Sequence, residues 1–233
     1  MAASCPATLL RVPTAVAWRE ETGHVMRGIS VALVTLIDVH ADAGYARSLF
    51  DELARQPLCD PALQIPSFCL TESYPNESPL CISAIQTFLE QLITRLRVRC
   101  QELVLAYIII ECVFRVDSRI LQKRTARLLF VAATSIVMKL TIDCEWTTRA
   151  TFALIDEMVV GCDATEFAQM ESAMLARLNY TLPVAGPSIG ELCIVYTVAL
   201  MNAGGAVMSR DEAKVLLVEE EATAATATAA VDY

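Results

Sequence analysis

The sequence predicts an all-α protein, because its apolar residues recur at helical spacing and no stretch alternates apolar and polar residues with a period of two. The clearest helix is Ala126–Asp143, in which Lys139 is the only charge between Leu128 and Ile142. A helix that is apolar on nearly all sides belongs in the middle of a bundle. Four further helices are predicted around it with short connectors, which is typical of a compact helical domain.

The overall composition fits one core with flanking elaborations. The chain has 233 residues, of which 55% are hydrophobic and only 19% are charged. Such a high apolar share indicates either long buried helices or an apolar surface that a partner covers. The net charge of -9 and the pI near 4.8 argue against nucleic acid, or an anionic membrane surface, as the main partner.

The cysteines and the N-terminal residues indicate the cellular compartment in which the protein is expected. The nine cysteines form no C-x-x-C pair, and the chain has only two histidines, so we predict no metal site. Reduced, mostly buried thiols favour a cytoplasmic or nuclear protein. Arg11 and Pro13 interrupt the N-terminal apolar stretch, which argues against a secretory signal.

The best candidate for a membrane span is Leu192–Ser209, which is uncharged throughout. It is at the lower length limit for a span and contains Asn202 and Gly204-Gly205, which a lipid environment disfavours. We therefore expect no membrane contact.

The elements follow one another in five segments. We expect a flexible leader over residues 1–27, then an N-terminal helical extension (Gly28–Arg55) and a proline-rich connector over residues 28–78. The main helical domain spans residues 79–184, a C-terminal helical extension spans 185–218, and a low-complexity, disordered tail spans 219–233. The helices predicted in the main domain are Leu80–Val98, Gln101–Val116, Ala126–Asp143, Arg149–Val160 and Asp163–Leu178. The run VLAYIII in the second could alone be a strand, but its length favours a helix.

No catalytic constellation is present in the sequence. The phosphate-binding, dinucleotide-binding, nucleophile-elbow and zinc-protease motifs are all missing, and both histidines lie upstream of the main domain. The carboxylate pairs Glu157 with Glu171 and Asp156 with Glu166 are better explained as solvated surface groups. We therefore predict that the protein is not an enzyme, with no catalytic residue and no cofactor.

Two charged residues stand out against their apolar surroundings. Lys139 either extends along the helix end toward Asp143 and Glu145 or is a fixed charge in a binding surface. Glu171 lies one residue round from the apolar stripe of the Asp163–Leu178 helix. It could reach Lys139 from there if the Ala126–Asp143 helix is central. The alternative is an ordinary exposed glutamate, and spacing alone leaves both alternatives open.

Three stretches carry a resemblance to a known family. LLFVAATSIVMKLTID resembles the third helix of the cyclin box, an apolar run that ends in a lysine. MESAMLARLNYTLPV resembles the fifth, in the form L-E-x-x-(F/M)-L-x-x-L-x-(F/Y)-x-L-x-V. ELVLAYIIIECVFR loosely resembles the second, with Glu111 at the acidic position and Cys112 where an arginine is usual. The lead-in SFCLTESYPNESPLCISAIQTFLEQL is similar to that of P/U-type cyclins, the single-box group named for the yeast phosphate-pathway cyclin.

The resemblance implies a five-helix cyclin box over residues 79–184, with additional N- and C-terminal helices. It implies a regulatory subunit that binds and activates a cyclin-dependent protein kinase by gripping the kinase's C-helix. In the family, a lysine and a glutamate pair with each other and hold that helix, and these roles fall on Lys139 and Glu171. The positions that line the groove for the C-helix are Ile136, Leu140, Leu175, Tyr180 and Leu182.

Two further expectations follow from the resemblance. The residues after Val184 are too few for a second five-helix box, and the first helix lacks a substrate-docking patch of the M-R-A-I-L type. The alternatives are a cyclin-fold adaptor that does not activate a kinase and a helical scaffold or membrane protein.

Overall fold

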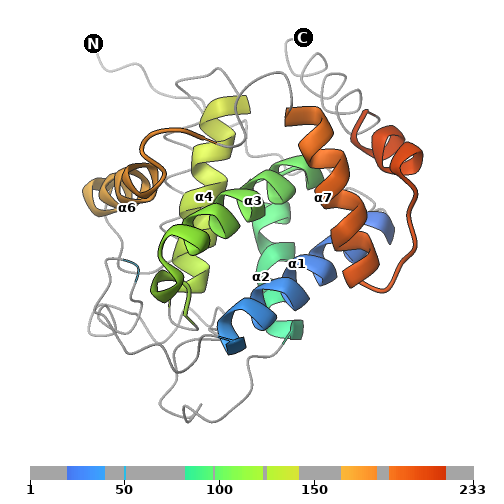
Figure 1. Ribbon diagram of the computed structural model, residues 1–233, viewed down its shortest axis with the longest axis horizontal. Coiled ribbons are helices and arrows are strands. Elements are labelled where there is room, and N and C mark those ends of the chain that lie inside the picture. The colour runs from blue at the N-terminus through green and yellow to red at the C-terminus, as the bar shows by residue number, and fades with distance from the viewer. Residues whose placement is uncertain are drawn as a thin grey trace, which may run out of the picture.

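The computed structural model describes residues 20–39, 50, 82–96, 98–122, 125–141, 164–182 and 189–218, and all regular structure in these ranges is helical. The elements are α1 (Glu20–Val39), α2 (Ile82–Leu96), α3 (Cys100–Val116), the 3₁₀ helix η3 (Ser118–Ile120), α4 (Ala126–Thr141), α6 (Ala164–Arg177) and α7 (Ile189–Ala203), shown in Figure 1. Residues 210–218 form a further helical segment. The all-α prediction is confirmed over the described part of the chain.

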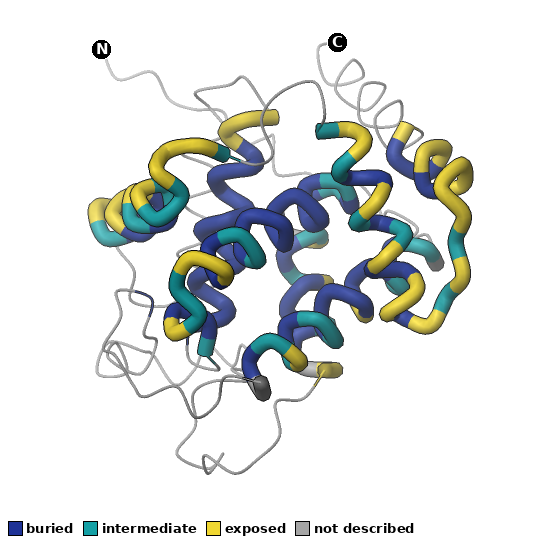
Figure 2. The backbone as a smooth tube through the Cα atoms, viewed as in Figure 1, coloured by how far each residue is buried: buried dark blue, intermediate teal, exposed yellow. Residues whose placement is uncertain are grey.

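The centre of the molecule is formed by α3 and α4. Every residue of α4 from Ala126 to Met138 is buried, as the apolar run predicts, and Figure 2 shows this helix dark blue over most of its length. α3 contacts more elements than α4 does: it packs against α1, α4, α6, α7 and η3. The sequence predicted that α4 alone is central. The structure shows that α3 shares this position, because α3 is apolar on all its faces from Leu103 to Ile110.

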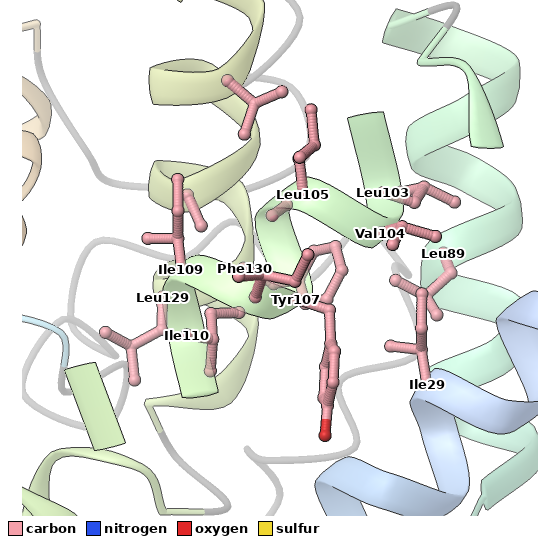
Figure 3. Close-up of a cluster of buried hydrophobic side chains, with 14 of the residues drawn as sticks. Ile29, Leu89, Leu103, Val104, Leu105, Tyr107, Ile109, Ile110, Leu129 and Phe130 are labelled. Atoms are coloured by element: carbon pink, nitrogen blue, oxygen red, sulfur yellow. The ribbon is translucent and has the colours of Figure 1, made fainter. Parts of the chain in front are cut away.

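The α3–α4 contact is made by large aliphatic and aromatic side chains. Leu129 and Phe130 of α4 lie beside Ile109 and Ile110 of α3, and all four are at most 2% exposed (Figure 3). The run VLAYIII is thus helical, as its length indicated. Burying side chains of this size contributes roughly 1.5–3 kcal/mol each.

α1 and α7 pack together so closely that their backbones approach each other. A Cβ atom at Gly28 of α1 would lie 1.9 Å from the Leu200 carbonyl oxygen of α7. At the end of α7, a Cβ at Gly204 would lie 2.1 Å from the His24 carbonyl oxygen. Only glycine fits at these two points, so the contact depends on the absence of a side chain there.

The N-terminal helix begins earlier than the sequence indicated. α1 starts at Glu20, within the segment that we predicted to be a flexible leader ending at residue 27. Thr22, Val25 and Met26 are buried and continue the apolar stripe upstream of Ile29. Gly28, where the helix was predicted to begin, lies inside α1, with its backbone against α7.

The boundaries of the helices predicted in the main domain differ from the observed ones by at most two residues, as expected where helix ends fray. The N-terminal helical extension was predicted to reach Arg55, whereas α1 ends at Val39, and residues 40–49 and 51–55 lie outside the described residues. The predicted Arg149–Val160 helix, the proline-rich connector up to residue 78 and the tail 219–233 lie outside the described residues. In the Leu192–Ser209 stretch, α7 ends at Ala203 and a turn follows. None of the described helices is long and apolar enough to cross a membrane.

Candidate functional site

Lys139 lies in the last turn of α4, where the buried run ends. Its side chain is 40% exposed, whereas the preceding residue, Met138, is 5% exposed. An ammonium group at this position keeps part of its hydration while its stem covers apolar surface. Asp143 and Glu145, toward which the lysine could have extended, lie outside the described residues.

Glu171 of α6 meets Lys139 directly. The Lys139 Nζ atom is 2.8 Å from Glu171 Oε1 and 2.6 Å from Oε2, so both carboxylate oxygens accept from it. The Glu171 side chain is only 10% exposed, which excludes the alternative of an ordinary surface glutamate. The predicted pairing of the two residues is confirmed, and it joins α4 to α6 at their contact.

Ser135 is the third member of this network. Its hydroxyl donates to Glu171 Oε1 at 2.6 Å, and the residue is 3% exposed. Ser135 and Lys139 are four residues apart and therefore share one face of α4. Sequence reasoning missed Ser135, because a serine one turn before the lysine has several ordinary uses and only the packing of α6 against α4 shows this one.

The five apolar residues that the resemblance assigns to the groove differ in exposure. Ile136 is 5% exposed and belongs to the core, while Leu140 is 50% and Tyr180 is 71% exposed. Leu175 and Leu182 are half-buried and pack against the core. Leu140 and Tyr180 therefore keep half or more of their surface exposed, and Ile136 contributes mainly to the core.

A turn after α6 places Tyr180. The Tyr180 backbone N–H donates to the Leu175 carbonyl at 2.8 Å, and the Asn179 N–H donates to the Ala176 carbonyl at 3.0 Å, which is the Schellman pattern. Asn179 and Tyr180 have φ values of 50° and 56°. Asparagine tolerates this left-handed region, but a tyrosine there costs roughly 1–2 kcal/mol. This conformational cost falls on a large aromatic residue that is exposed.

A second buried carboxylate holds the end of α4 from the other side. Glu102, 1% exposed, accepts from the Arg99 backbone N–H at 2.8 Å and from its guanidinium at 2.7 Å and 3.0 Å. The Thr141 hydroxyl of α4 lies 3.2 Å from the same carboxylate and 3.1 Å from the Val137 carbonyl, and its single proton is shared between these two acceptors. The last turn of α4 is thus bonded to both α3 and α6. The sequence carries little sign of this arrangement, because arginine is not one of the residues preferred at the N-cap of a helix.

Glu111 stands at the acidic position of the stretch that resembles the second cyclin-box helix. Its bonds belong to a network separate from that of Lys139 and Glu171. It pairs with Arg115 one turn later and with the hydroxyl of Tyr196 on α7. Burial and the Glu111 carboxylate raise the pKa of Tyr196 to about 12, and burial is the main cause of the raised pKa of Tyr107 beside it. Burial also raises the pKa of the Cys112 thiol, so Cys112 stays protonated at neutral pH.

Among the described residues, no group of histidine, cysteine and acidic side chains could hold a metal ion. Cys100, Cys112 and Cys193 are not in disulfide bonds, and burial raises the pKa of Cys193 to about 11. Protonated thiols are poor nucleophiles and poor metal ligands. Cys100 and Cys193 are buried in the core and Cys112 packs against it, so these side chains fill space there as small apolar groups.

The chain was compared with known proteins at three levels. No protein-family model, no curated protein and no solved structure matches it. Its function is therefore inferred from the geometry described above and from the sequence resemblance.

Proposed function

We propose that this protein is a cyclin-like regulatory subunit that binds a cyclin-dependent protein kinase through its C-helix and activates it. The observation that carries the proposal is the Lys139–Glu171 pair. It joins α4 and α6 through the two residues to which the resemblance assigns the roles of the cyclin-box lysine and glutamate.

The geometry of the pair supports a docking role. An ammonium group has three N–H donors, and the two Glu171 oxygens account for two of them. With its side chain 40% exposed, Lys139 can offer the third donor to an arriving backbone carbonyl or side chain. Exposed Leu140 and Tyr180 would supply apolar burial around it. A charged group that fixes register among apolar contacts is the usual arrangement when a helix binds in a groove.

A second candidate function is an adaptor that has the cyclin-like surface but does not activate a kinase. Cys112 stands where the resemblance leads one to expect an arginine, and Glu111 bonds instead to Arg115 and Tyr196. Under this alternative, the kinase would bind without any increase in phosphoryl transfer.

The test is a pull-down of the tagged full chain from its native cells, followed by a kinase assay on the eluate. Wild type is compared with Lys139→Ala and Glu171→Ala. Each substitution leaves the other charge unpaired near the interface, so we expect kinase recovery and activity to fall together by about tenfold or more. Arg210→Ala is the matched control, because the Arg210–Glu191 pair is exposed on both sides and lies elsewhere.

Each outcome has a distinct meaning. Recovery and activity that stay unchanged in both site variants would show that the residue assignment is wrong. A kinase recovered without stimulated activity would favour the adaptor. If wild type recovers no kinase, the proposed function fails altogether.

A further inference from the structure

Ser135 uses its hydroxyl differently from other buried hydroxyl residues of this chain. Ser30 and Thr134 donate to the carbonyl four residues earlier in their own helices, to Met26 and Phe130, both at 2.8 Å. Ser135 donates at 2.6 Å across the α4–α6 contact, to Glu171 Oε1. The resemblance assigns no role to this serine.

The serine is the rigid member of the network. Glu171 has three rotatable side-chain bonds, and Lys139 has four and keeps 40% of its side chain exposed. Without another donor, the carboxylate and the ammonium could move together toward water, because the ion pair alone does not fix where the pair lies. Ser135 is 3% exposed, and its short side chain is fixed to the buried part of α4. Its bond to a charged acceptor therefore anchors Oε1, and Oε1 in turn orients Nζ.

We propose that Ser135 is a positioning residue, which holds the Glu171 carboxylate so that the Lys139 ammonium is in place before a partner binds. The inference rests on the proposed function for the identity of that partner. Preorganisation matters here because a docking helix would otherwise bear the entropic cost of ordering both charged side chains. Ser135 thus acts on binding through Glu171 and does not contact the partner itself.

The first measurement follows the Lys139 ammonium in the isolated full chain by ¹H–¹⁵N NMR. Hydrogen exchange of this group with water is slow only while its bonds to Glu171 persist. We expect Ser135→Ala to accelerate the exchange by about tenfold, the effect of losing one hydrogen bond to a charged group. Ser135→Thr, which keeps a hydroxyl, should restore most of the protection. Thr134→Val is the matched control, because it removes a neighbouring buried hydroxyl that bonds only within α4, and exchange should stay within about twofold of wild type.

The second measurement is the affinity for the kinase subunit recovered in the pull-down, arranged as a double-mutant cycle. Ser135→Ala should weaken binding by about tenfold in the wild-type background and by less than about twofold when Glu171→Gln is already present. A purely structural role for Ser135 in α4 packing would give the same loss in both backgrounds, and that result would overturn the proposal.

The two measurements separate this inference from the proposed function. Ammonium exchange that is unchanged in Ser135→Ala, or accelerated equally in Thr134→Val, contradicts the positioning role whether or not a kinase binds. If no kinase is recovered but exchange responds as expected, the positioning of Lys139 stands and the proposed partner is wrong.

Discussion

At the residue scale, the two charges of the candidate site are unequal in their exposure to water. The Lys139 side chain is 40% exposed and the Glu171 side chain is 10% exposed. If its partner is removed, Lys139 can rehydrate by extending into solvent. Glu171 cannot do so without leaving the α4–α6 contact, so its charge would stay buried with Ser135 as its remaining donor within the described part of the chain.

This inequality predicts the order in which two nearly isosteric variants lose stability. Lys139→Met should lower the free energy of unfolding by about 1–2 kcal/mol, below the cost for a fully buried pair because the ammonium is partly exposed. Glu171→Gln should cost about 1 kcal/mol or less, since the amide oxygen can still accept from Ser135 and the lysine can return to water. Urea denaturation of both variants measures the difference. Equal losses, or a larger loss in Glu171→Gln, would contradict the assigned burial.

At the element scale, the α1–α7 contact depends on glycines. α1 also contains a glycine outside this contact, which serves as a control for substitution. Gly28→Ala would place a Cβ 1.9 Å from the Leu200 carbonyl, so the helices must separate, and we expect a loss of about 2 kcal/mol or more. Gly23 lies in the same helix, and a Cβ added there would have nothing within 4 Å. Gly23→Ala should therefore raise stability by about 0.5–1 kcal/mol through helix propensity. Thermal unfolding of both variants is the measurement, and changes of the same sign would refute the close approach.

The helical segment 210–218 depends on a cap that responds to pH. The Ser209 hydroxyl and backbone N–H both donate to Glu212 Oε2 at 2.7 Å, and these bonds lower the pKa of Glu212. Because the folded-state pKa lies below the unfolded value of about 4.5, the contribution to stability is complete above that pH and is lost as the pH falls through the folded-state pKa. Lowering the pH should therefore fray the start of this helical segment.

The measurement is a pH titration of the Cα chemical shifts of residues 210–218 by NMR. Glu212→Gln should remove most of the acid-induced change between about pH 5 and pH 2, and Ser209→Ala should reduce helicity at neutral pH. Asp211→Asn is the control, because it removes a charge from the same turn without breaking either bond to Ser209. A titration that persists in Glu212→Gln would assign the effect to another group.

The sequence allowed some of these features to be predicted and not others. Lys139 drew attention because it interrupts an apolar run, and a charge in such a place needs a partner or access to water. Its pairing with Glu171 was predicted from the cyclin-box resemblance, since spacing alone left Glu171 equally able to be an exposed residue. The Ser135 and Glu102 bonds were not, since a serine or a helix-start glutamate has several ordinary uses and only the packing selects one. The start of α1 was missed because Gly28 and its neighbours resemble a helix boundary until α7 is seen against them.

At the scale of the whole molecule, the buried core continues beyond the segment that resembles a cyclin box. Ile29 of α1 and Cys193 of α7 are fully buried in the same cluster as Leu103 and Leu129. α1 packs on α2 and α3, and α7 packs on α1 and α3. The extensions therefore supply one side of the core, and removing them would expose the apolar residues of α3 that they cover.

The last prediction follows from this shared core. A fragment of residues 79–184, the predicted box alone, should not show the cooperative unfolding transition of the full chain, because α3 would lose the helices that bury its α1- and α7-facing side. A fragment of residues 20–218 retains every described residue and is the control, which should keep the transition. Urea unfolding followed by circular dichroism compares them. If residues 79–184 unfold as cooperatively and at the same midpoint as the full chain, α1 and α7 are appended to a self-sufficient domain, and their contacts with α3 contribute little to its stability.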